Sequence, residues 1–552
     1  MSKQRIIIIG GGFAGVFAGQ AITRLLKLRR GNTDGYHVEL INPTNYFVFQ
    51  PLLPEVVSGT INAPDAVSPL RALLPGVHFR MAEVIDLDVA KQQITLLQGS
   101  RRIPQSLSYD QLILTPGQRT DTSHLPGFAE HSFTLRDLDD AHALRNHVLQ
   151  CLEHADITQN PELKQRLLTF VVVGAGFSGV ETIGELKEMV HRTLRYYPNI
   201  QSEEINMILV QRGDRILPEL SPQLAAYAQT DLVQRGVDVR LNSSITKATA
   251  YAVFEDDGNR ISTSTLVTTV GNGPVQLATS LPFETHRGRI VADIHLRVKG
   301  HKNIWTAGDV AAVPNATTEI TPATAQFAVR QAQQLAHNLI AELQGKPLQH
   351  FDYTPKGSMA SLGNYRGVAE VFGVRISGLA AWFLWRGFYI AMLPGFATRL
   401  RVALNWLLDY FVPRNSVQIR NKPAGSAAKR LYAAGDVLFR PGQIVDGLYI
   451  LISGKLESRS SDGTFLRVIK PGDHWGERSM ETHHVTVGTL SALEDSEVLV
   501  LKREDFELLY QSLPVLRQYF HSISDNTYPD ELRSASRNES PLTEYLLEGQ
   551  EK

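Results

Sequence analysis

The sequence predicts an α/β fold up to about residue 415 and a small antiparallel β-barrel after it. Two glycine loops of the pattern G-x-G-x-x-G, each between an apolar strand and a helical segment, predict the α/β part. Short apolar runs separated by glycine turns, at Gly435, Gly454 and Gly463 among others, predict the barrel. The 552 residues exceed what a single hydrophobic core accommodates, so we expect several domains.

The first glycine loop follows a buried strand. Arg5–Ile9 is apolar and β-branched beyond its first residue, as parallel strands covered on both faces are. We therefore interpret it as a strand and not as part of a removable targeting segment. In the loop, Gly10 makes the tight turn, Gly12 lets the backbone approach a pyrophosphate, and Gly15 lets the next helix pack closely on the strand. The N-terminus of that helix presents free N–H groups to the phosphates.

A second unit of the same kind begins about 160 residues later. The strand Leu168–Val173 runs into Gly174, Gly176 and Gly179, and a helical pattern continues through Glu185. Two such units predict two Rossmann-type dinucleotide-binding domains, one inserted in the other.

Neither unit has the acidic residue expected at the end of its second strand. The first has Asn42 there, and the second has Gln211 followed by Arg212. An amide still bonds a ribose hydroxyl, whereas a carboxylate would repel a 2′-phosphate. We therefore expect the second site to accept NADPH as well as NADH.

The composition restricts the functional classes. Apolar residues make up 43% and charged residues 20% of the chain, which is typical of globular domains. The formal net charge of −1 gives no sign of a nucleic-acid partner. The single cysteine, Cys151, excludes an intramolecular disulfide and the cysteine-pair chemistry of disulfide reductases. We expect Cys151 to be a packed thiol in a helix over 141–155, and we expect no metal site.

Further blocks follow the two loops in a characteristic order. They are Tyr46–Glu55, Tyr109–Gly117, Gly288–Asp293, Ile304–Asp309, and Ala325–Ala328 with Gln331. Together with the loops, they resemble a type II NADH dehydrogenase, the single-chain NAD(P)H:quinone oxidoreductase that does not pump protons. The resemblance covers residues 1 to about 415.

The resemblance implies a flavin and a nicotinamide site. It assigns FAD to the first loop and to Asp309, whose carboxylate would bond the ribityl–phosphate part. The FAD residues it implies are Gly10, Gly12, Phe13, Ala14, Gly15, Asn42, Gln50, Thr115, Gly117, Asp309 and Ala325. Those implied for NADH or NADPH are Gly174, Gly176, Phe177, Ser178, Gly179, Gln211, Arg212 and Gly271. Hydride would pass from nicotinamide to flavin, and two electrons from flavin to quinone.

Three residues match catalytic positions of that family. Glu181 and Lys356 match a carboxylate and a lysine near the flavin ring, and Gln326 matches a quinone contact. Arg330 stands where the family pattern has a second glutamine, so the contacts to quinone differ here.

The segment 376–411 is the candidate for contact with the membrane. Its uncharged runs are interrupted by Arg386 and Arg399, and a spanning helix needs about 20 apolar residues, so we expect no transmembrane helix. In its second half, apolar residues from Phe396 to Phe411 share one helical face, which is typical of an interfacial helix. The tryptophans at 382, 385 and 406 suit the headgroup boundary, although the first half also fits a buried helix or a dimer contact. We expect peripheral attachment to the cytoplasmic face of the membrane, and a homodimer.

The residues after about 430 resemble a cyclic nucleotide-binding domain. The resemblance rests on Leu448–Gly454 and on Trp475–Met480. It implies a ligand site at Gly476, Glu477, Arg478 and Ser479, but Thr486 stands where the family has a phosphate-binding arginine. We therefore favour a regulatory module with degenerate ligand binding over one that binds cyclic nucleotide tightly.

The predicted organisation has six parts. They are an FAD domain (1–120 and 285–350), an NAD(P)H domain (121–284), a membrane-associating segment (351–415), a linker (416–430), the barrel (431–521) and a disordered tail (522–552). Two other functions stay open at this point. The chain could be a soluble flavin reductase of a protein electron carrier, or a non-enzymatic sensor of NAD(P)H and cyclic nucleotide.

Overall fold

The computed structural model describes residues 3–27, 35–99, 102–315, 320–415, 417–418 and 427–502, the last range without 444, 446, 477–485 and 487. The chain forms two compact units. The first contains residues 1–124, 133–245 and 265–418, and the second contains 125–132, 246–264 and 419–552. This division places 125–132 and 246–264 with the C-terminal residues, whereas the sequence assigns them to the NAD(P)H domain.

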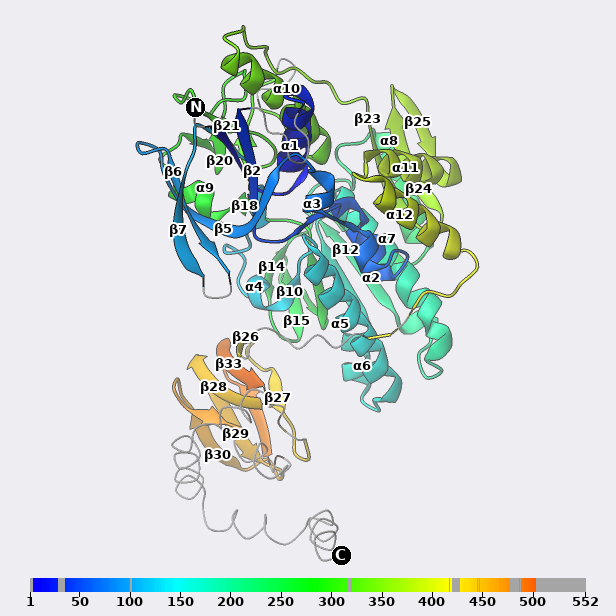
Figure 1. Ribbon diagram of the computed structural model, residues 1–552. Coiled ribbons are helices and arrows are strands. Elements are labelled where there is room, and N and C mark those ends of the chain that lie inside the picture. The colour runs from blue at the N-terminus through cyan, green and yellow to red at the C-terminus, as the bar shows by residue number, and fades with distance from the viewer. Residues whose placement is uncertain are drawn as a thin grey trace, which may run out of the picture. The chain divides into compact units, whose positions relative to one another are not determined.

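A seven-stranded sheet forms the first half of unit 1 (Figure 1), in the order β21-β8-β1-β2-β5-β6-β7. Its first five strands in this order are parallel, and β6 and β7 extend it as antiparallel strands. The bounds are β1 (Gln4–Ile9), β2 (Tyr36–Asn42), β5 (His78–Asp88), β6 (Gln93–Gln98), β7 (Ile103–Ser108), β8 (Gln111–Leu114) and β21 (Ile304–Thr306). Since β21 pairs with β8, the chain between them is an insertion.

The insertion carries a five-stranded sheet in the order β10-β17-β11-β12-β13. Its strands are β10 (Ser132–Phe133), β11 (Thr169–Val173), β12 (Asn206–Gln211), β13 (Val237–Leu241) and β17 (Thr265–Thr268). All residues of β11 are buried, as its uniform apolar sequence predicts. The predicted pair of Rossmann-type sheets is thus present.

Helices cover these sheets. The long ones are α1 (Phe13–Leu25), α5 (Leu138–Ile157), α7 (Phe177–Thr193), α8 (Pro222–Gln234) and α10 (Ala325–Leu343). Helices α1 and α10 lie side by side although some 300 residues separate them in the sequence (Figure 1). Cys151 is buried in α5, and burial raises the pKa of its thiol to about 11, which keeps it protonated and unreactive.

Shorter elements connect this framework. They are β3 (Tyr46–Val48), α2 (Leu53–Ser58), β4 (Val67–Pro69), α3 (Leu70–Leu73), β9 (Gln118–Thr120), α6 (Pro161–Leu167), β18 (Asn272–Pro274), α9 (Gln276–Ser280), β19 (Thr285–His286), β20 (Arg289–Val291) and β22 (Ala311–Ala312).

Unit 1 ends in a three-stranded antiparallel sheet and two helices. These are β23 (Gly357–Gly363), β24 (Arg366–Val371), β25 (Val374–Ser377), α11 (Gly378–Met392) and α12 (Phe396–Leu408). No helix in the described ranges is long and apolar enough to cross a membrane.

The predicted place of the tryptophans in this region is wrong. Trp382, Trp385 and Trp406 are buried, at 5% exposure or less, so they do not lie at a membrane boundary. Arg386 stacks between two of them, 3.8 Å from the ring of Trp382 and 4.5 Å from that of Trp406. For α11, which turns Trp382 and Trp385 inward, the structure agrees with the alternative of a buried helix that the sequence left open.

Unit 2 contains two four-stranded antiparallel sheets, β26-β33-β28-β31 and β27-β32-β29-β30. Their strands are β26 (Ala427–Tyr432), β27 (Val437–Phe439), β28 (Gly447–Ser453), β29 (Leu456–Ser460), β30 (Phe465–Ile469), β31 (His474–Trp475), β32 (Gly488–Ala492) and β33 (Ser496–Lys502). Strand β26 begins inside the predicted linker 416–430, because its residues pair with β33. The predicted tail 522–552 lies outside the described residues.

The same unit includes a small sheet of β14 (Ile245–Ala248), β15 (Ala252–Glu255) and β16 (Arg260–Ser262), and the short helix α4 (Phe128–His131). Tyr251 meets Tyr432 edge to face, and the backbone N–H of Leu431 donates to His131. Burial lowers the pKa of His131 to about 4, so the imidazole stays neutral and accepts this bond.

The glycine loops allow the closest packing in unit 1. A Cβ added at Gly15 would overlap the carbonyl oxygen of Gly10, and one at Gly179 would overlap that of Gly174. Both Gly10 and Gly174 have positive φ, 103° and 96°, which glycine adopts without strain.

We predict that Gly15→Ala lowers the free energy of unfolding by about 1–3 kcal/mol, because overpacking at a helix–strand contact has this cost. Gly387→Ala is the matched control, since nothing lies within 4 Å of the added Cβ. Thermal or urea unfolding of both variants measures the difference. Equal stability of the two variants would contradict the close packing described above.

Candidate functional site

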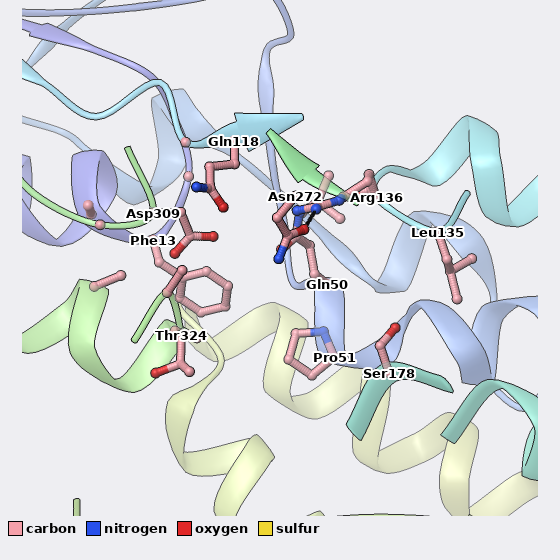
Figure 2. Close-up of a pocket in the computed structure, with 18 of the residues that line it drawn as sticks. Phe13, Gln50, Pro51, Gln118, Leu135, Arg136, Ser178, Asn272, Asp309 and Thr324 are labelled. Carbon is pink, nitrogen blue, oxygen red and sulfur yellow. Dashed lines mark hydrogen bonds between the residues drawn. The ribbon is translucent and has the colours of Figure 1, made fainter. Parts of the chain in front are cut away.

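One cavity opens between the two glycine loops. It has a volume of about 490 Å³ and is lined by both loops and by the carboxyl ends of strands from both sheets. Figure 2 shows Phe13, Asp309 and Thr324 along one side of it and Ser178 and Leu135 along the other. Because ligands of doubly wound sheets bind at this edge, the cavity is placed for dinucleotides.

Most of the predicted site residues meet in this cavity. Those that line it are Gly10, Gly12, Phe13, Ala14, Asn42, Gln50, Thr115, Gly117, Phe177, Ser178, Glu181, Asp309 and Ala325. Those that do not line it are Gly15, Gly174, Gly176, Gly179, Gln211, Arg212 and Gly271. Of these, Gly271 lies between the lining residues Val270 and Asn272.

The two amides that replace the expected acids have the same role in both units. The Oδ1 atom of Asn42 accepts from the N–H of Gly11 at 2.8 Å, and Oε1 of Gln211 accepts from the N–H of Ala175 at 2.9 Å. Each side chain thus fixes the middle of its glycine loop. Arg212 is exposed beside the second loop.

Asp309 lies opposite an arginine that sequence reasoning missed. Burial raises the pKa of the Asp309 carboxyl, and the positive charges of Arg136 and Arg289 oppose this shift. Arg136 lines the cavity and bonds Asn272, another lining residue of the insertion (Figure 2). No glycine pattern or spacing marks Arg136, because its role depends on the fold bringing residues 136 and 272 together.

Glu181 is a second acid of the cavity whose pKa is raised. It lies in α7 with 5% exposure, and its Oε1 accepts from the indole N–H of Trp385 at 2.8 Å and from the N–H of Ser361 at 3.1 Å. Burial raises the pKa of its carboxyl to about 8, against the effect of these two bonds. Nearby Glu55 and Glu185 raise this pKa further.

Glu55 and Glu185 extend Glu181 into a buried carboxylate cluster. Glu55 accepts from the indole N–H of Trp406 at 2.7 Å and from Arg386 at 3.4 Å. Burial raises the pKa of Glu55 to about 7, and Arg386 opposes this. Glu185 accepts from the hydroxyl of Ser58 at 2.5 Å and lies 3.6 Å from Arg414. The two acids with raised pKa values, Glu181 and Glu55, hold a proton near neutral pH.

A second cavity, of about 540 Å³, lies on the other side of α10 and α11. Ala325 and Ala328 of α10 and Tyr389 of α11 face the first cavity, whereas Gln326 and Phe388 line the second. Lys356 lines the second cavity too, so Gln326 and Lys356 are brought together here and not beside Glu181. The amide of Gln326 donates to the carbonyl of Gly357 at 3.2 Å.

The chain matches three family models in sequence order. Residues 4–332 match the pyridine nucleotide-disulphide oxidoreductase family, 356–415 the NDH2 C-terminal domain, and 429–512 the cyclic nucleotide-binding domain. It is 31% identical over 433 residues to the type II NADH:quinone oxidoreductase Ndh of Mycobacterium tuberculosis, covering 75% of this chain and 89% of that relative.

The chain belongs to the type II NADH:quinone oxidoreductase family. It is an oxidoreductase that transfers electrons from NADH to quinone, so the non-enzymatic sensor is excluded. It is also 31% identical over 418 residues to the demethylphylloquinone reductase NdbB of a Synechocystis strain, covering 74% of this chain and 96% of that protein. The structure of NDH2 from Plasmodium falciparum with NADH has the same fold, with a TM-score of 0.69, 20% identity and coverage of 75% of this chain and 100% of that one.

The first cavity fits the flavin dinucleotide that this family implies. A Cβ at Gly12 would meet nothing within 4 Å, so the loop leaves open space where a pyrophosphate would pass. Asp309, which follows β21 and lines the cavity, offers an acceptor to a hydroxyl. The donor and acceptor set therefore suits FAD.

The ligand site of the C-terminal domain is described in part. Gly476 has a φ of 103°, while Glu477, Arg478 and Ser479 lie outside the described residues. Thr486, at the position of the expected arginine, bonds the loop at 440–443: its N–H donates to the carbonyl of Gln443 at 2.7 Å. A threonine held this way offers no cation to a cyclic phosphate.

We predict that Glu181→Gln changes how stability depends on pH. The pKa of Glu181 is about 8 in the folded protein against an ordinary 4.5. Its contribution to stability is therefore fully present below the unfolded pKa and is lost as the pH rises through about 8. Glutamine accepts the same two bonds without charge, so the wild-type melting temperature should fall relative to that of the variant between about pH 4.5 and 8 and should then level off.

Calorimetry across this range measures the effect, with the exposed Glu162→Gln as the control. A difference between Glu181→Gln and wild type that stays constant with pH would contradict the raised pKa.

Proposed function

We propose that the chain binds FAD at its first glycine loop, oxidises NADH or NADPH at the second, and reduces a membrane quinone without pumping protons. The observation that carries this proposal is the arrangement of the cavities. Both loops open on one cavity, and helices α10 and α11 divide it from a second, more apolar one. Electron donor and electron acceptor then bind on opposite sides of one flavin site. FAD supplies the two-electron transfer between them.

In this proposal, the residues of the first cavity orient the two nucleotides and hold them in place. The N–H groups at the start of α1 and α7 point at the phosphates of the two nucleotides. Asp309 binds a ribityl hydroxyl, and Asn42 and Gln211 keep the loops in shape. Phe13, Pro51 and Tyr389 line the cavity and limit the access of water to the reacting atoms.

Glu181 supplies a proton in this proposal. Reduction of quinone by NADH consumes one proton beyond the hydride, since NADH, quinone and H⁺ give NAD⁺ and quinol. The raised pKa of about 8 keeps the Glu181 carboxyl protonated near neutral pH and able to give its proton up. Glu55, whose pKa is raised to about 7, replaces that proton.

The second cavity is the proposed quinone site. Its walls include Phe17, Met359 and Phe388, which suit an apolar ring, and Gln326 and Lys356 offer donors to the quinone carbonyls. The α11–α12 turn at Leu393–Gly395 also lines it, so a lipid-soluble substrate reaches it from that side.

One preparation tests these assignments. The purified protein should show flavin absorbance and should reduce a soluble quinone with NADH and with NADPH. A colourless protein that FAD does not reconstitute would refute the flavin assignment, and turnover with ferredoxin in place of quinone would favour the soluble reductase. Addition of cyclic AMP to this assay tests the C-terminal domain: a change in rate at micromolar ligand would refute degenerate binding.

We predict that Gln211→Glu lowers kcat/KM for NADPH about tenfold or more and that for NADH much less. The carboxylate still accepts from the N–H of Ala175, so the loop keeps its shape, but the charge repels a 2′-phosphate. Steady-state kinetics with both nucleotides measure this. Arg212→Gln is the companion variant, since it removes a cation without adding an anion. An unchanged NADPH preference in both variants would refute the assignment.

Helices α11 and α12 form the proposed membrane surface. Phe396, Leu400, Leu404, Leu407 and Phe411 are all exposed on one side of α12 and its extension, as the sequence predicts. The opposite side is turned onto the protein: Asn405 donates to Asp65 at 2.8 Å, and Asp409 accepts from Arg414 at 2.7 Å. The polar half of the helix is thus satisfied internally, and the apolar half is left for lipid at the cytoplasmic face.

We predict that Leu404→Glu weakens binding to lipid vesicles about tenfold or more, because a charge would have to enter the acyl boundary. Val233→Glu on α8 is the matched control, with 50% exposure against 46% for Leu404. Co-sedimentation with vesicles measures the partition. An equal loss of vesicle binding in both variants, or no loss in either, would exclude this face as the membrane contact.

The C-terminal domain is proposed as a regulatory module, and the enzyme as a homodimer. The match over 429–512 and the antiparallel sheets of unit 2 support the first part. The bonds of Thr486 support regulation without tight binding of cyclic nucleotide.

A further inference from the structure

The charged side chains of the second cavity are all cationic. Arg330, Lys356 and Arg399 line it, and no carboxylate in the described part of the chain does. Arg399 is engaged by the backbone, since it donates to the carbonyls of Leu393 at 2.7 Å and Ala391 at 3.0 Å. Two cations therefore stay available to a ligand.

Arg330 is held next to Gln326 by an aromatic ring. It lies one helical turn after Gln326 in α10, so both side chains are on one face. The guanidinium carbon is 5.5 Å from the centre of the Tyr353 ring, and the Tyr353 hydroxyl is 3.4 Å from Oε1 of Gln326. Arg330 donates one guanidinium N–H to Gln333 at 3.3 Å and has further N–H groups to donate.

The chemistry proposed for this cavity creates a negative charge there. A quinone that takes up two electrons and one proton becomes a quinol anion, and a second proton converts the anion to neutral quinol. NADH supplies the hydride equivalent, and the proton comes from solvent through the protein. Between formation of the quinol anion and its protonation, an oxyanion lies in a partly apolar cavity, where an unpaired charge is costly. A neutral glutamine, which the family pattern has at this position, offers only a dipole.

We propose that Arg330 binds the oxyanion of the reduced quinone and so makes this cavity selective for ligands that are, or become, anionic. The inference rests on the proposed quinone site. Lys356, on the loop before β23, provides a second positive charge. Arg330 acts on the anion and not on the neutral substrate, so it contributes to the reduction step more than to quinone binding.

A pair of matched ligands tests this directly on the flavin-loaded full-length protein. 2-Hydroxy-1,4-naphthoquinone is an anion at neutral pH, and 2-methoxy-1,4-naphthoquinone has nearly the same shape without charge. Binding is measured by equilibrium dialysis for wild type, Arg330→Gln and Arg330→Lys. We expect Arg330→Gln to lower the affinity for the hydroxy ligand about tenfold to a hundredfold, as loss of a charge-assisted bond does. The affinity for the methoxy ligand should change less than about twofold. Arg330→Lys should keep most of the preference for the hydroxy ligand over the methoxy ligand.

Turnover gives a second readout. With a neutral quinone, Arg330→Gln should lower kcat while KM stays nearly constant, which is the signature of an interaction made only on the way to product. Unchanged binding of the hydroxy ligand by Arg330→Gln would overturn the proposal. So would an equal loss for both ligands, which would indicate a general packing role.

Two further outcomes separate the alternatives. If Arg330→Gln loses affinity for vesicles of acidic lipid and keeps its hydroxy-ligand affinity, Arg330 serves membrane attachment and the proposal fails. If wild type neither binds the methoxy ligand nor reduces quinone, the quinone site itself is wrong. If wild type does both and the variant shows the same ligand preference, only the role of Arg330 is wrong.

Discussion

The buried carboxylate of Glu181 is the point on which the catalytic half of the molecule depends. It lies on α7 of the inserted domain and is bonded by an indole from α11 and a backbone N–H from β23. Two segments, about 180 and 200 residues further along the chain, thus meet α7 at this acid. Such an acid is stable inside a protein only if its polar atoms are satisfied or it is protonated. Both conditions hold here, because two N–H groups donate to the carboxylate and its pKa is raised to about 8. The proposed role of Glu181 as a proton donor uses both.

The two cavities differ in their charged side chains. The first contains the acids Asp309 and Glu181 and the cation Arg136. The second contains cations and no acid among the described lining residues. Helices α10 and α11 divide them and contribute side chains to both. In the function that we propose, this wall lies between the electron donor and the electron acceptor.

Helix α12 has an inner and an outer apolar side. Val402 and Trp406 pack inside the fold, whereas Phe396, Leu400, Leu404 and Leu407 are exposed. Next to the inner side, Asn405 bonds Asp65, and Asp409, just after the helix, bonds Arg414. The exposed apolar side is the one that we propose for contact with lipid.

The sequence by itself determined the parts that depend on local chemistry. The glycine loops, the strands Gln4–Ile9 and Thr169–Val173, the exposed face from Phe396 to Phe411 and the barrel strands all follow from residue type and period. The FAD and NAD(P)H sides of the cavity follow from the order of the motifs. The tertiary structure decided what depends on contacts between distant segments. It turned Trp382, Trp385 and Trp406 inward, paired Arg136 with Asn272, and put Gln326 and Lys356 in a cavity apart from Glu181. No period in the chain encodes these contacts, because they join different elements of the fold and exist only once the sheets and helices have packed.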